Sequence, residues 1–512
     1  MEIKTNVKRR KVEKIWRRIG TGLLCFLLFI GFLAFFSALW YVSTYGDTGF
    51  DSIIFTLTSG LGGAQSDLIL GYLWGAVLPT VLCSSILCFL LFFPWKKTLR
   101  IWKIQLLPVK RFAACVISLV LSMGLLIHAA FQSGMVDYTV SQFQISSLYE
   151  DLYRDPASVN IQFPEEKRNL VYILLESMET SYLSEDLGGA LDRNLIPELH
   201  QLALNNTNFS HNDQVGGFLQ VPGASWTIGS MVAQTSGVPL KTPEGVSDWQ
   251  NGYGKDGEFL PGITTMMDIL DANGYNQALM VGSDANFGGR YTYYDTHGAD
   301  KIYDIYTARQ DGIVPYGYFV WWGMEDLHLF DYAKEKLTEM SAQDEPFAFT
   351  MLTVDTHHIG GYTCAYCDDE SEESYENAIS CSSKQVYAFV QWLQQQPFYE
   401  NTTVVVTGDH YSMDKGYFNR NVDDNYTRHV YNCFLNSAVQ TDNVKNRQFC
   451  ALDMFPTTLA AMGCTVEGNR LGLGTNLYSD QKTLIELFGY NTFCRELNTS
   501  SDYYHRFYEA KA

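Results

Sequence analysis

Three apolar runs constrain the fold more than any other feature of the sequence. They extend over about Ile19 to Val42, Leu68 to Trp95 and Phe112 to Phe131. Each is long enough to cross a bilayer as a helix, which takes about 20 residues. The first run follows eight basic residues between Lys4 and Arg18 and lacks a small-residue cleavage site, so we expect a retained anchor and not a signal peptide. Residues 1–131 are therefore predicted to form a membrane anchor of three transmembrane helices.

The loops between these runs predict the orientation of the anchor. Residues 43–67 contain three Asp and no Lys or Arg, whereas residues 96–111 contain six Lys or Arg and no acid. Basic loops stay on the cytoplasmic side of a membrane. We therefore expect the N-terminus and residues 96–111 in the cytoplasm, and everything after Phe131 outside the cell membrane.

The charge of the chain changes sign after the anchor. Through Phe131 there are 14 Lys or Arg and 5 Asp or Glu, a balance of +9, whereas the remainder has 22 and 51, a balance of −29. A surface this acidic repels phosphate backbones, so we expect no nucleic-acid partner. A local basic site for a single phosphate remains compatible with this balance.

Beyond the anchor, three further regions are expected. Residues 132–168 form a connector, in which polar and apolar residues alternate from Tyr138 to Tyr153 and predict an amphipathic helix on the membrane surface. Residues 169–490 form a large domain, and residues 491–512 form a C-terminal tail.

The large domain has the pattern of an α/β fold. Short apolar runs predict buried parallel strands at Asn169–Leu175, Ala278–Val281, Phe347–Val354 and Thr402–Thr407. Apolar residues three or four apart predict helices at Pro261–Asn273, Tyr332–Ser341, Ser383–Gln395 and Leu452–Met462. We therefore expect a mostly parallel sheet covered by helices.

Polar side chains stand where these strands end. They are Glu176, Ser283 with Asp284, Asp355 with His357 and His358, and Asp409 with His410. Ligands bind beyond the carboxyl ends of strands in an open parallel sheet, so we expect these residues to converge. Carboxylate and imidazole groups suit a divalent ion such as Mn²⁺, Mg²⁺ or Zn²⁺. A solvated turn or a helix cap is the alternative role for Glu176.

The segment 222–237 supplies a candidate nucleophile. Thr227 stands where a helix is expected to begin, so its oxygen would face the positive end of the helix dipole and the metal. A helix cap is the commoner role for a threonine at such a place. Ser225 and Ser230 are rival nucleophiles in the same segment.

At this point the ordered motifs carry a family resemblance. They are Leu-Glu-Ser at 175–177, Trp-Thr-Ile-Gly-Ser-Met at 226–231, Phe-Gly-Gly-Arg with His-Gly within 287–298, Leu-Thr-Val-Asp-Thr-His-His at 352–358, Asp-His at 409–410 and Leu-Gly-Leu-Gly at 471–474. This set resembles the phosphoglycerol transferase branch of the alkaline phosphatase/sulfatase superfamily. It is similar to the lipoteichoic acid synthases and, more closely, to the transferases that modify periplasmic glucans.

The resemblance implies an activity and roles for individual residues. Glycerophosphate would pass from phosphatidylglycerol to a glycan or teichoic-type acceptor through a covalent intermediate on Thr227. The metal ligands would be Glu176, Thr227, Asp409 and His410, with Mn²⁺ as the expected ion. Arg290 and His357 would contact the substrate phosphate, and His358 could exchange roles with His357. Lipoteichoic acid synthases have five spans and an aromatic residue two positions before the arginine, where this chain has three spans and Gly288.

Two other enzyme classes share this type of fold. A phosphoethanolamine transferase would also use a threonine, and a lipid-donor assay separates it from the first interpretation. A sulfatase-type hydrolase needs a cysteine or serine in a C/S-x-P-x-R context, which this sequence lacks. A receptor without activity would tolerate loss of the metal ligands, yet all four are present.

Three cysteines crowd one acidic stretch of the external part, namely Cys364, Cys367 and Cys381. A Cys-x-x-Cys pair can indicate redox chemistry or zinc, but neither a redox βαβ context nor a second such pair accompanies it. An oxidising exterior favours a structural disulfide. The resemblance to the glucan-modifying transferases implies that the pair is Cys367 with Cys381.

The orientation of the anchor can be tested by cysteine labelling in intact cells. An impermeant thiol reagent should label a cysteine engineered in residues 43–67 and miss one in residues 96–111, because the basic loop is cytoplasmic. The parent chain supplies the background labelling. The opposite pattern would reverse the predicted orientation.

Overall fold

The computed structural model describes residues 2–46, 49–59, 66–92, 99–101, 104–106, 110–241 and 258–509. Its residues divide into two compact units. The helical unit comprises Met1–Asp47 and Gln65–Asp137, and the α/β unit comprises Thr48–Ala64 and Tyr138–Ala512. Each unit is described by itself.

The helical unit contains the three expected membrane helices. The stretches Lys11–Tyr45, Ile69–Phe92 and Arg111–Gln132 are each long and apolar enough to cross a membrane. Its helices are α1 (Glu2–Tyr45), α3 (Ser66–Tyr72), the π-helix η1 (Leu73–Val77), α4 (Leu78–Phe92) and α5 (Arg111–Gln132), and its two short strands are β1 (Leu99–Ile101) and β2 (Ile104–Leu106). A Cβ at Gly31 would lie 3.2 Å from Ser122 Cα, so small residues let α1 and α5 approach closely.

A sheet of seven strands forms the centre of the α/β unit. Its order is β5 (Gly217–Phe218), β10 (Val430–Leu435), β9 (Thr402–Gly408), β4 (Asn169–Leu175), β8 (Phe347–Leu352), β6 (Asn276–Val281) and β7 (Lys301–Tyr303). Neighbours from β9 to β7 are parallel, whereas β10 runs antiparallel to β9 and β5 antiparallel to β10. This confirms the predicted α/β fold with a mostly parallel sheet.

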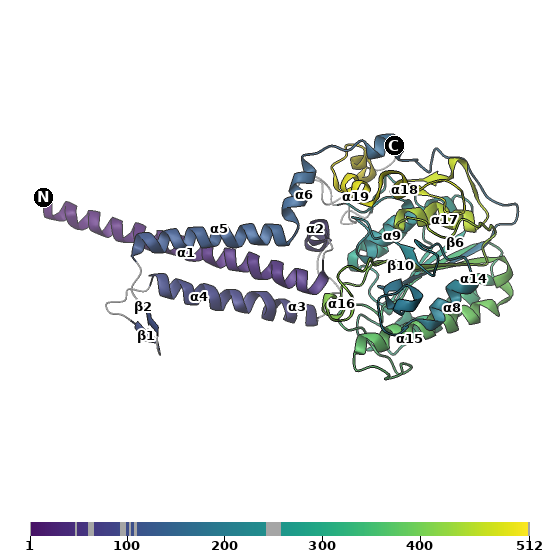
Figure 1. Cartoon of the computed structure of the whole chain (residues 1–512), viewed down its shortest axis with the longest axis horizontal. Coiled ribbons are helices and arrows are strands. Elements are labelled where there is room, and N and C mark those ends of the chain that lie inside the picture. The colour runs from purple at the N-terminus through teal and green to yellow at the C-terminus, as the bar shows by residue number, and fades with distance from the viewer. Residues whose placement is uncertain are drawn as a thin grey trace. The chain divides into compact units, whose positions relative to one another are not determined.

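Helices cover both faces of this sheet (Figure 1). Alternate residues of β4 explain why, because successive side chains of a strand point to opposite faces. Val171 and Ile173 belong to one core with α8 (Pro197–Asn205), α14 (Asp326–Ser341) and α15 (Ser374–Gln394). Leu170 and Tyr172 belong to the other core with α9 (Thr227–Ser236), α11 (Met266–Asp271) and α17 (Met454–Ala461).

Shorter elements make up the rest of the secondary structure in the described residues. The α-helices are α2 (Phe50–Ser59), α6 (Met135–Gln142), α7 (Leu148–Leu152), α12 (Arg290–Thr296), α13 (Ile305–Gln310), α16 (Lys415–Asn421), α18 (Leu484–Phe488) and α19 (Tyr490–Asn498). The 3₁₀-helices are η2 (Thr180–Tyr182), η3 (Glu185–Leu187), η4 (Phe287–Gly289), η5 (Pro397–Asn401), η6 (Ala451–Asp453), η7 (Glu467–Asn469) and η8 (Tyr504–Tyr508). Two small pairs join β3 (Ile161–Gln162) to β11 (Thr465–Val466) and β12 (Arg470–Leu471) to β13 (Gly474–Thr475).

From Tyr138 onward the predicted connector belongs to the α/β unit, and so does the predicted C-terminal tail. Residues 138–153 do not form one helix, because α6 ends at Gln142 and α7 begins at Leu148. Tyr149 is 1% exposed and its ring contacts Tyr504 and Phe507. The aromatic side chains of the last residues thus fill the same core as the connector, so residues 491–509 are part of the folded unit.

The strand end at Gly408 gives a stability prediction. A Cβ at Gly408 would lie 2.1 Å from the backbone oxygen of Met178, so Gly408→Ala must displace one strand end. Overpacking of this kind costs roughly 1–3 kcal/mol, and we expect a lower melting temperature for the full chain in detergent. Gly416→Ala is the matched control, because a Cβ at Gly416 would lie 3.5 Å from its nearest neighbouring atoms. Equal melting temperatures for the two variants would contradict this prediction.

Candidate metal centre and active site

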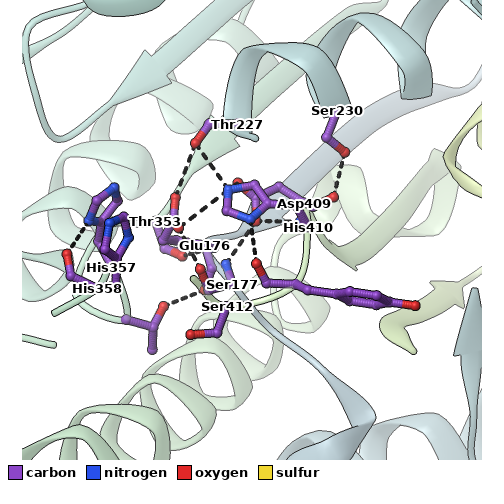
Figure 2. A network of polar contacts seen from close by, with 12 residues as sticks. Glu176, Ser177, Thr227, Ser230, Thr353, His357, His358, Asp409, His410 and Ser412 are labelled. Carbon is purple, nitrogen blue, oxygen red and sulfur yellow. Dashed lines mark hydrogen bonds and ion pairs between the residues drawn. The ribbon is translucent and has the colours of Figure 1, made fainter. Parts of the chain in front are cut away.

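Two neighbouring strands bring the first three candidate ligands together. Glu176 directly follows β4, and Asp409 with His410 directly follows β9. The strands are parallel, and Leu175 pairs with Gly408 at their last positions. The two carboxylates therefore leave the sheet side by side at its carboxyl edge, as Figure 2 shows.

Ser177 holds both carboxylates in place. Its hydroxyl donates to Glu176 Oε1 at 2.7 Å, and its backbone N–H donates to Asp409 Oδ1 at 2.8 Å. Ser177 is fully buried and has a φ of 53°, in the left-handed region that few residues other than glycine adopt. The sequence pattern did not reveal this role, because a serine after a strand has no distinctive signal.

Thr227 is the first residue of α9 and faces the same cluster. Its Oγ1 lies 3.4 Å from Glu176 Oε2 and 3.4 Å from His410 Nε2 (Figure 2). The N-cap position of α9 belongs to Trp226, so the Thr227 side chain is directed at the cluster without capping the helix. Ser230 lies further along α9, where its hydroxyl donates to the backbone oxygen of Asp409 at 2.5 Å. That bond fixes α9 against the end of β9.

Burial and mutual repulsion set the protonation of the cluster. Burial and the charge of Glu176 raise the pKa of Asp409 to about 7. Burial alone would raise the pKa of Glu176, but the charges of His357 and His410 bring it below the ordinary value. Burial alone would lower the pKa of His410, but Asp409 and Glu176 raise it. The two buried carboxylates thus need positive charge or a proton beside them, which His410 or a bound cation can supply.

The hydrogen bonds of His410 fit a bound metal ion. Its Nδ1 lies 2.8 Å from the backbone oxygen of Tyr411, which requires a proton on Nδ1 and leaves a lone pair on Nε2 of the neutral ring. That Nε2 lies 3.3 Å from Asp409 Oδ2 and 3.7 Å from Glu176 Oε1. One ligand atom from each of the three residues lies within 4.8 Å of the others. Together with Thr227, these residues could hold a divalent cation, and their donor set suits Mn²⁺, Mg²⁺ or Zn²⁺.

Arg290 is buried at the start of α12. Its Nη2 donates to Ser283 Oγ at 2.9 Å and to the backbone oxygen of Asp284 at 2.8 Å, and its Nε donates to the backbone oxygen of Phe287 at 2.9 Å. Burial lowers its pKa to about 10, which leaves it charged at neutral pH. Its charge contributes, after those of His357 and His410, to the low pKa of Glu176. The expected contact of Arg290 with a substrate phosphate remains a prediction.

The two histidines after β8 differ in exposure. His357 is partly exposed and its ring lies 4.7 Å from the ring of Trp322, whereas His358 is 7% exposed. The charge of His357 acts on Glu176. Burial lowers the pKa of both rings, and that of His358 falls well below the ordinary value. These observations favour His357 over His358 as the substrate contact, and Trp322 is an aromatic neighbour that the sequence did not reveal.

Two threonines that follow β8 hydrogen-bond to the backbone of Glu176. Asp355, in the same segment, differs from the convergence that the sequence predicted. Thr353 Oγ1 accepts from the backbone N–H of Glu176 at 3.0 Å, and the Thr356 hydroxyl donates to its backbone oxygen at 2.5 Å. Asp355 lies instead beside Asp326, whose carboxylate accepts its backbone N–H at 3.2 Å. Burial and the charge of Asp326 raise the pKa of Asp355 well above its ordinary value, which favours the neutral carboxyl group.

The three crowded cysteines come together as free thiols. The sulfur atoms of Cys364, Cys367 and Cys381 all lie within 4.8 Å of one another. The expected bond between Cys367 and Cys381 remains a prediction.

The carboxyl edge of a mostly parallel sheet, where this cluster lies, is the place at which α/β domains bind their ligands. A family model described as Sulfatase matches residues 168–464 of the chain. The match covers more than half of the sequence, so the chain belongs to the sulfatase family.

Curated relatives and a solved structure are also similar to this chain. Phosphoglycerol transferase I of Xanthomonas campestris is 32% identical over 255 residues, which are 49% of this chain and 34% of that protein. Phosphoglycerol transferase I of Salmonella choleraesuis is 30% identical over 347 residues, which are 66% of this chain and 42% of that protein. The chain thus spans less than half the length of these relatives. The lipooligosaccharide phosphoethanolamine transferase A of Neisseria meningitidis shares the fold, with a TM-score of 0.50, 13% identity, and coverage of 87% of this chain and 84% of that chain.

Ser177 gives a prediction about the metal centre. Ser177→Ala removes the hydrogen bond to Glu176 but keeps the backbone bond to Asp409, so the Glu176 carboxylate loses one restraint. We expect metal affinity to fall roughly 10- to 100-fold, as is usual when a partner of a metal ligand is lost. Titration of the metal-free full chain by calorimetry measures this.

Ser236→Ala is the control, because the Ser236 hydroxyl is buried in the same unit and donates within α9 to Val232. An unchanged affinity in Ser177→Ala, or an equal loss in both variants, would show that the Ser177 hydroxyl does not position Glu176.

Proposed function

We propose that this chain is a membrane-anchored, metal-dependent phosphoglycerol transferase. It would move glycerophosphate from phosphatidylglycerol to a hydroxyl of a cell-envelope glycan or teichoic-type polymer. The observation that carries the proposal is the Thr227 hydroxyl, which lies 3.4 Å from both Glu176 Oε2 and His410 Nε2 at the start of a helix. The names of the similar curated proteins support the choice of phosphoglycerol.

The cluster suits an activated nucleophile. A divalent ion held by Glu176, Thr227, Asp409 and His410, expected to be Mn²⁺, would lower the pKa of the Thr227 hydroxyl and offset charge on the phosphate. The bond from Ser230 to Asp409 holds the first turn of α9 and therefore the Thr227 oxygen. Because Thr227 is the first residue of α9, an anionic substrate bound to it would lie near the positive end of the helix dipole.

The reaction would proceed in two displacements at phosphorus. The Thr227 oxygen attacks the phosphorus of phosphatidylglycerol, the bond from phosphorus to the diacylglycerol oxygen breaks, and diacylglycerol leaves with a proton. Glycerophosphate is then esterified to Thr227. An acceptor hydroxyl attacks the same phosphorus, its proton leaves, and the Thr227 hydroxyl is regenerated. Arg290 and His357 would offset charge on the phosphoryl oxygens during both steps.

The three apolar helices support a donor that resides in the bilayer. With the N-terminus in the cytoplasm, the α/β unit would lie on the outer side of the cell membrane, where envelope polymers are assembled. A lipid donor and an external glycan acceptor fit that placement.

A donor assay tests the substrate class. The full chain in detergent is incubated with labelled phosphatidylglycerol, phosphatidylethanolamine or an aryl sulfate, with and without Mn²⁺. We expect metal-dependent release of diacylglycerol from phosphatidylglycerol alone. Consumption of phosphatidylethanolamine would support a phosphoethanolamine transferase instead, and hydrolysis of the aryl sulfate would support a sulfatase.

Thr227 is predicted to carry the covalent intermediate. Thr227→Ala should reduce turnover by several orders of magnitude while the chain stays folded and still binds metal, because Glu176, Asp409 and His410 remain. Mass spectrometry of the wild-type chain given donor without acceptor should show a glycerophosphate adduct on the 223–237 peptide.

The alternatives within this peptide give different outcomes. A purely structural threonine would cost about 1 kcal/mol on removal and leave turnover largely intact. A fully active Thr227→Ala variant, or an adduct mapped to Ser225 or Ser230, would overturn the assignment.

A further inference from the structure

Three cysteine sulfurs form a second buried cluster outside the site described above. Cys364 and Cys367 lie in the segment between β8 and α15, and Cys381 lies on α15. The Cys364 sulfur is 3.6 Å from that of Cys367 and 3.9 Å from that of Cys381. Cys364 and Cys381 are 7% and 2% exposed.

These separations match those of thiolates around one metal ion. Zinc binds sulfur at about 2.3 Å with tetrahedral geometry, which places two sulfur ligands about 3.8 Å apart. The two observed separations of 3.6 and 3.9 Å lie on either side of this value.

The backbone around the cysteines supplies donors to sulfur. Residues 364–367 form a tight turn in which the backbone N–H of Cys367 donates to the Cys364 oxygen at 3.1 Å. The N–H of Tyr366 is 3.4 Å from the Cys364 sulfur, and the N–H of Cys364 is 3.1 Å from the Cys367 sulfur. Donors directed at sulfur stabilise the thiolate form and orient metal ligands.

A buried amide lies against the same sulfurs. Gln385 follows Cys381 by one turn of α15 and is 5% exposed. Its Nε2 lies 3.3 Å from the Cys381 sulfur and 3.8 Å from the Cys364 sulfur. Its Oε1 is buried and has no hydrogen-bond partner among the residues that the structure describes. A buried amide oxygen without a partner is costly, so this atom points to a group that the site is built to receive.

We propose that Cys364, Cys367 and Cys381 bind a Zn²⁺ ion, or another thiophilic divalent cation, as three thiolates. An oxygen ligand completes the coordination, either Gln385 Oε1 or a solvent molecule that donates to it. The soft sulfur donors separate this site from the oxygen- and nitrogen-rich cluster at Glu176.

The ion would tie the segment after β8 to α15. His357 and His358 precede Cys364 by seven and six residues, so the clamp restrains the segment that presents both histidines. The acidic residues 368–370 follow directly and favour a cation nearby. This site and the Cys367–Cys381 disulfide exclude one another, because a sulfur in a disulfide cannot bind the ion as a thiolate.

Cobalt substitution of the full chain tests the proposal. The chain is purified from membranes in detergent without oxygen, metals are removed, and Co²⁺ is added. We expect an intense near-ultraviolet absorption from sulfur-to-cobalt charge transfer, with one more ion per chain than in Cys381→Ser. Cys367→Ser should lose the same band. Cys367 is the least buried of the three cysteines, so this variant keeps the test valid if Cys381→Ser fails to fold.

Two further variants assign the band to this cluster. Cys494→Ser alters a lone cysteine of α19 and should keep it. Glu176→Gln removes a ligand of the other centre and should also keep it, so failure of the proposed transferase activity leaves this result unaffected. Absence of the band in the wild-type chain would overturn the proposal. So would a disulfide among these three cysteines in chains whose thiols are alkylated at lysis, or equal loss of the band in Cys494→Ser.

Discussion

The parallel pairing of β4 with β9 is the contact on which the rest of the site depends. Because Leu175 pairs with Gly408, Glu176 and Asp409 emerge at the same height from neighbouring strands. Two neighbouring buried carboxylates are unfavourable together, and burial and the charge of Glu176 both raise the pKa of Asp409. The pairing of these two strands is therefore enough to make positive charge favourable at this edge of the sheet.

Helix α9 is hydrogen-bonded to the same end of β9. Ser230 donates to the backbone oxygen of Asp409, and Gln234 donates to that of Gly408 at 3.1 Å. These bonds join the buried face of α9 to the last residues of β9, so the N-terminus of the helix cannot move independently of the ligands. The position of Thr227 thus follows from hydrogen bonds that the side chains of Ser230 and Gln234 make, and these bonds involve no atom of Thr227 itself.

Sequence patterns predicted the parts of the fold in which burial is simple. The central strand β4 is buried and hydrophobic after its first residue, and its predicted bounds Asn169–Leu175 agree with the structure. Strand β10 (Val430–Leu435) was missed because Asn432 interrupts its apolar run, and the structure buries that amide by hydrogen bonds to Phe209. Helices α14 and α15 begin six and nine residues before the predicted starts, because their first turns bury polar residues such as Asp326 and Asn377, which obscure the apolar period.

Three further differences came from contacts between distant segments. The predicted helix at Pro261–Asn273 shortens to α11, because the side chains of Thr265 and Asp268 cap a later start. The aromatic residues near Tyr149 and Phe507 have no helical period, so their shared core could not be inferred locally. Asp355 follows a strand as Glu176 does, but Asp326 from another element accepts its backbone N–H and holds it apart. The predicted strand ends therefore indicated which residues lie at the edge of the sheet, but not which of them contact one another.

In the proposed function, Arg290 would allow so acidic a chain to hold an anionic substrate. The formal net charge is −20, which would repel a phosphodiester over most of the surface. The acceptors that fix Arg290 are the Ser283 hydroxyl and two backbone oxygens, all of which are neutral. Its orientation is therefore set without a direct bond to a carboxylate, and its charge acts at longer range on Glu176 and Asp409. Burial removes the screening that water would provide, so a phosphate beside Arg290 would experience a stronger attraction than at an exposed arginine.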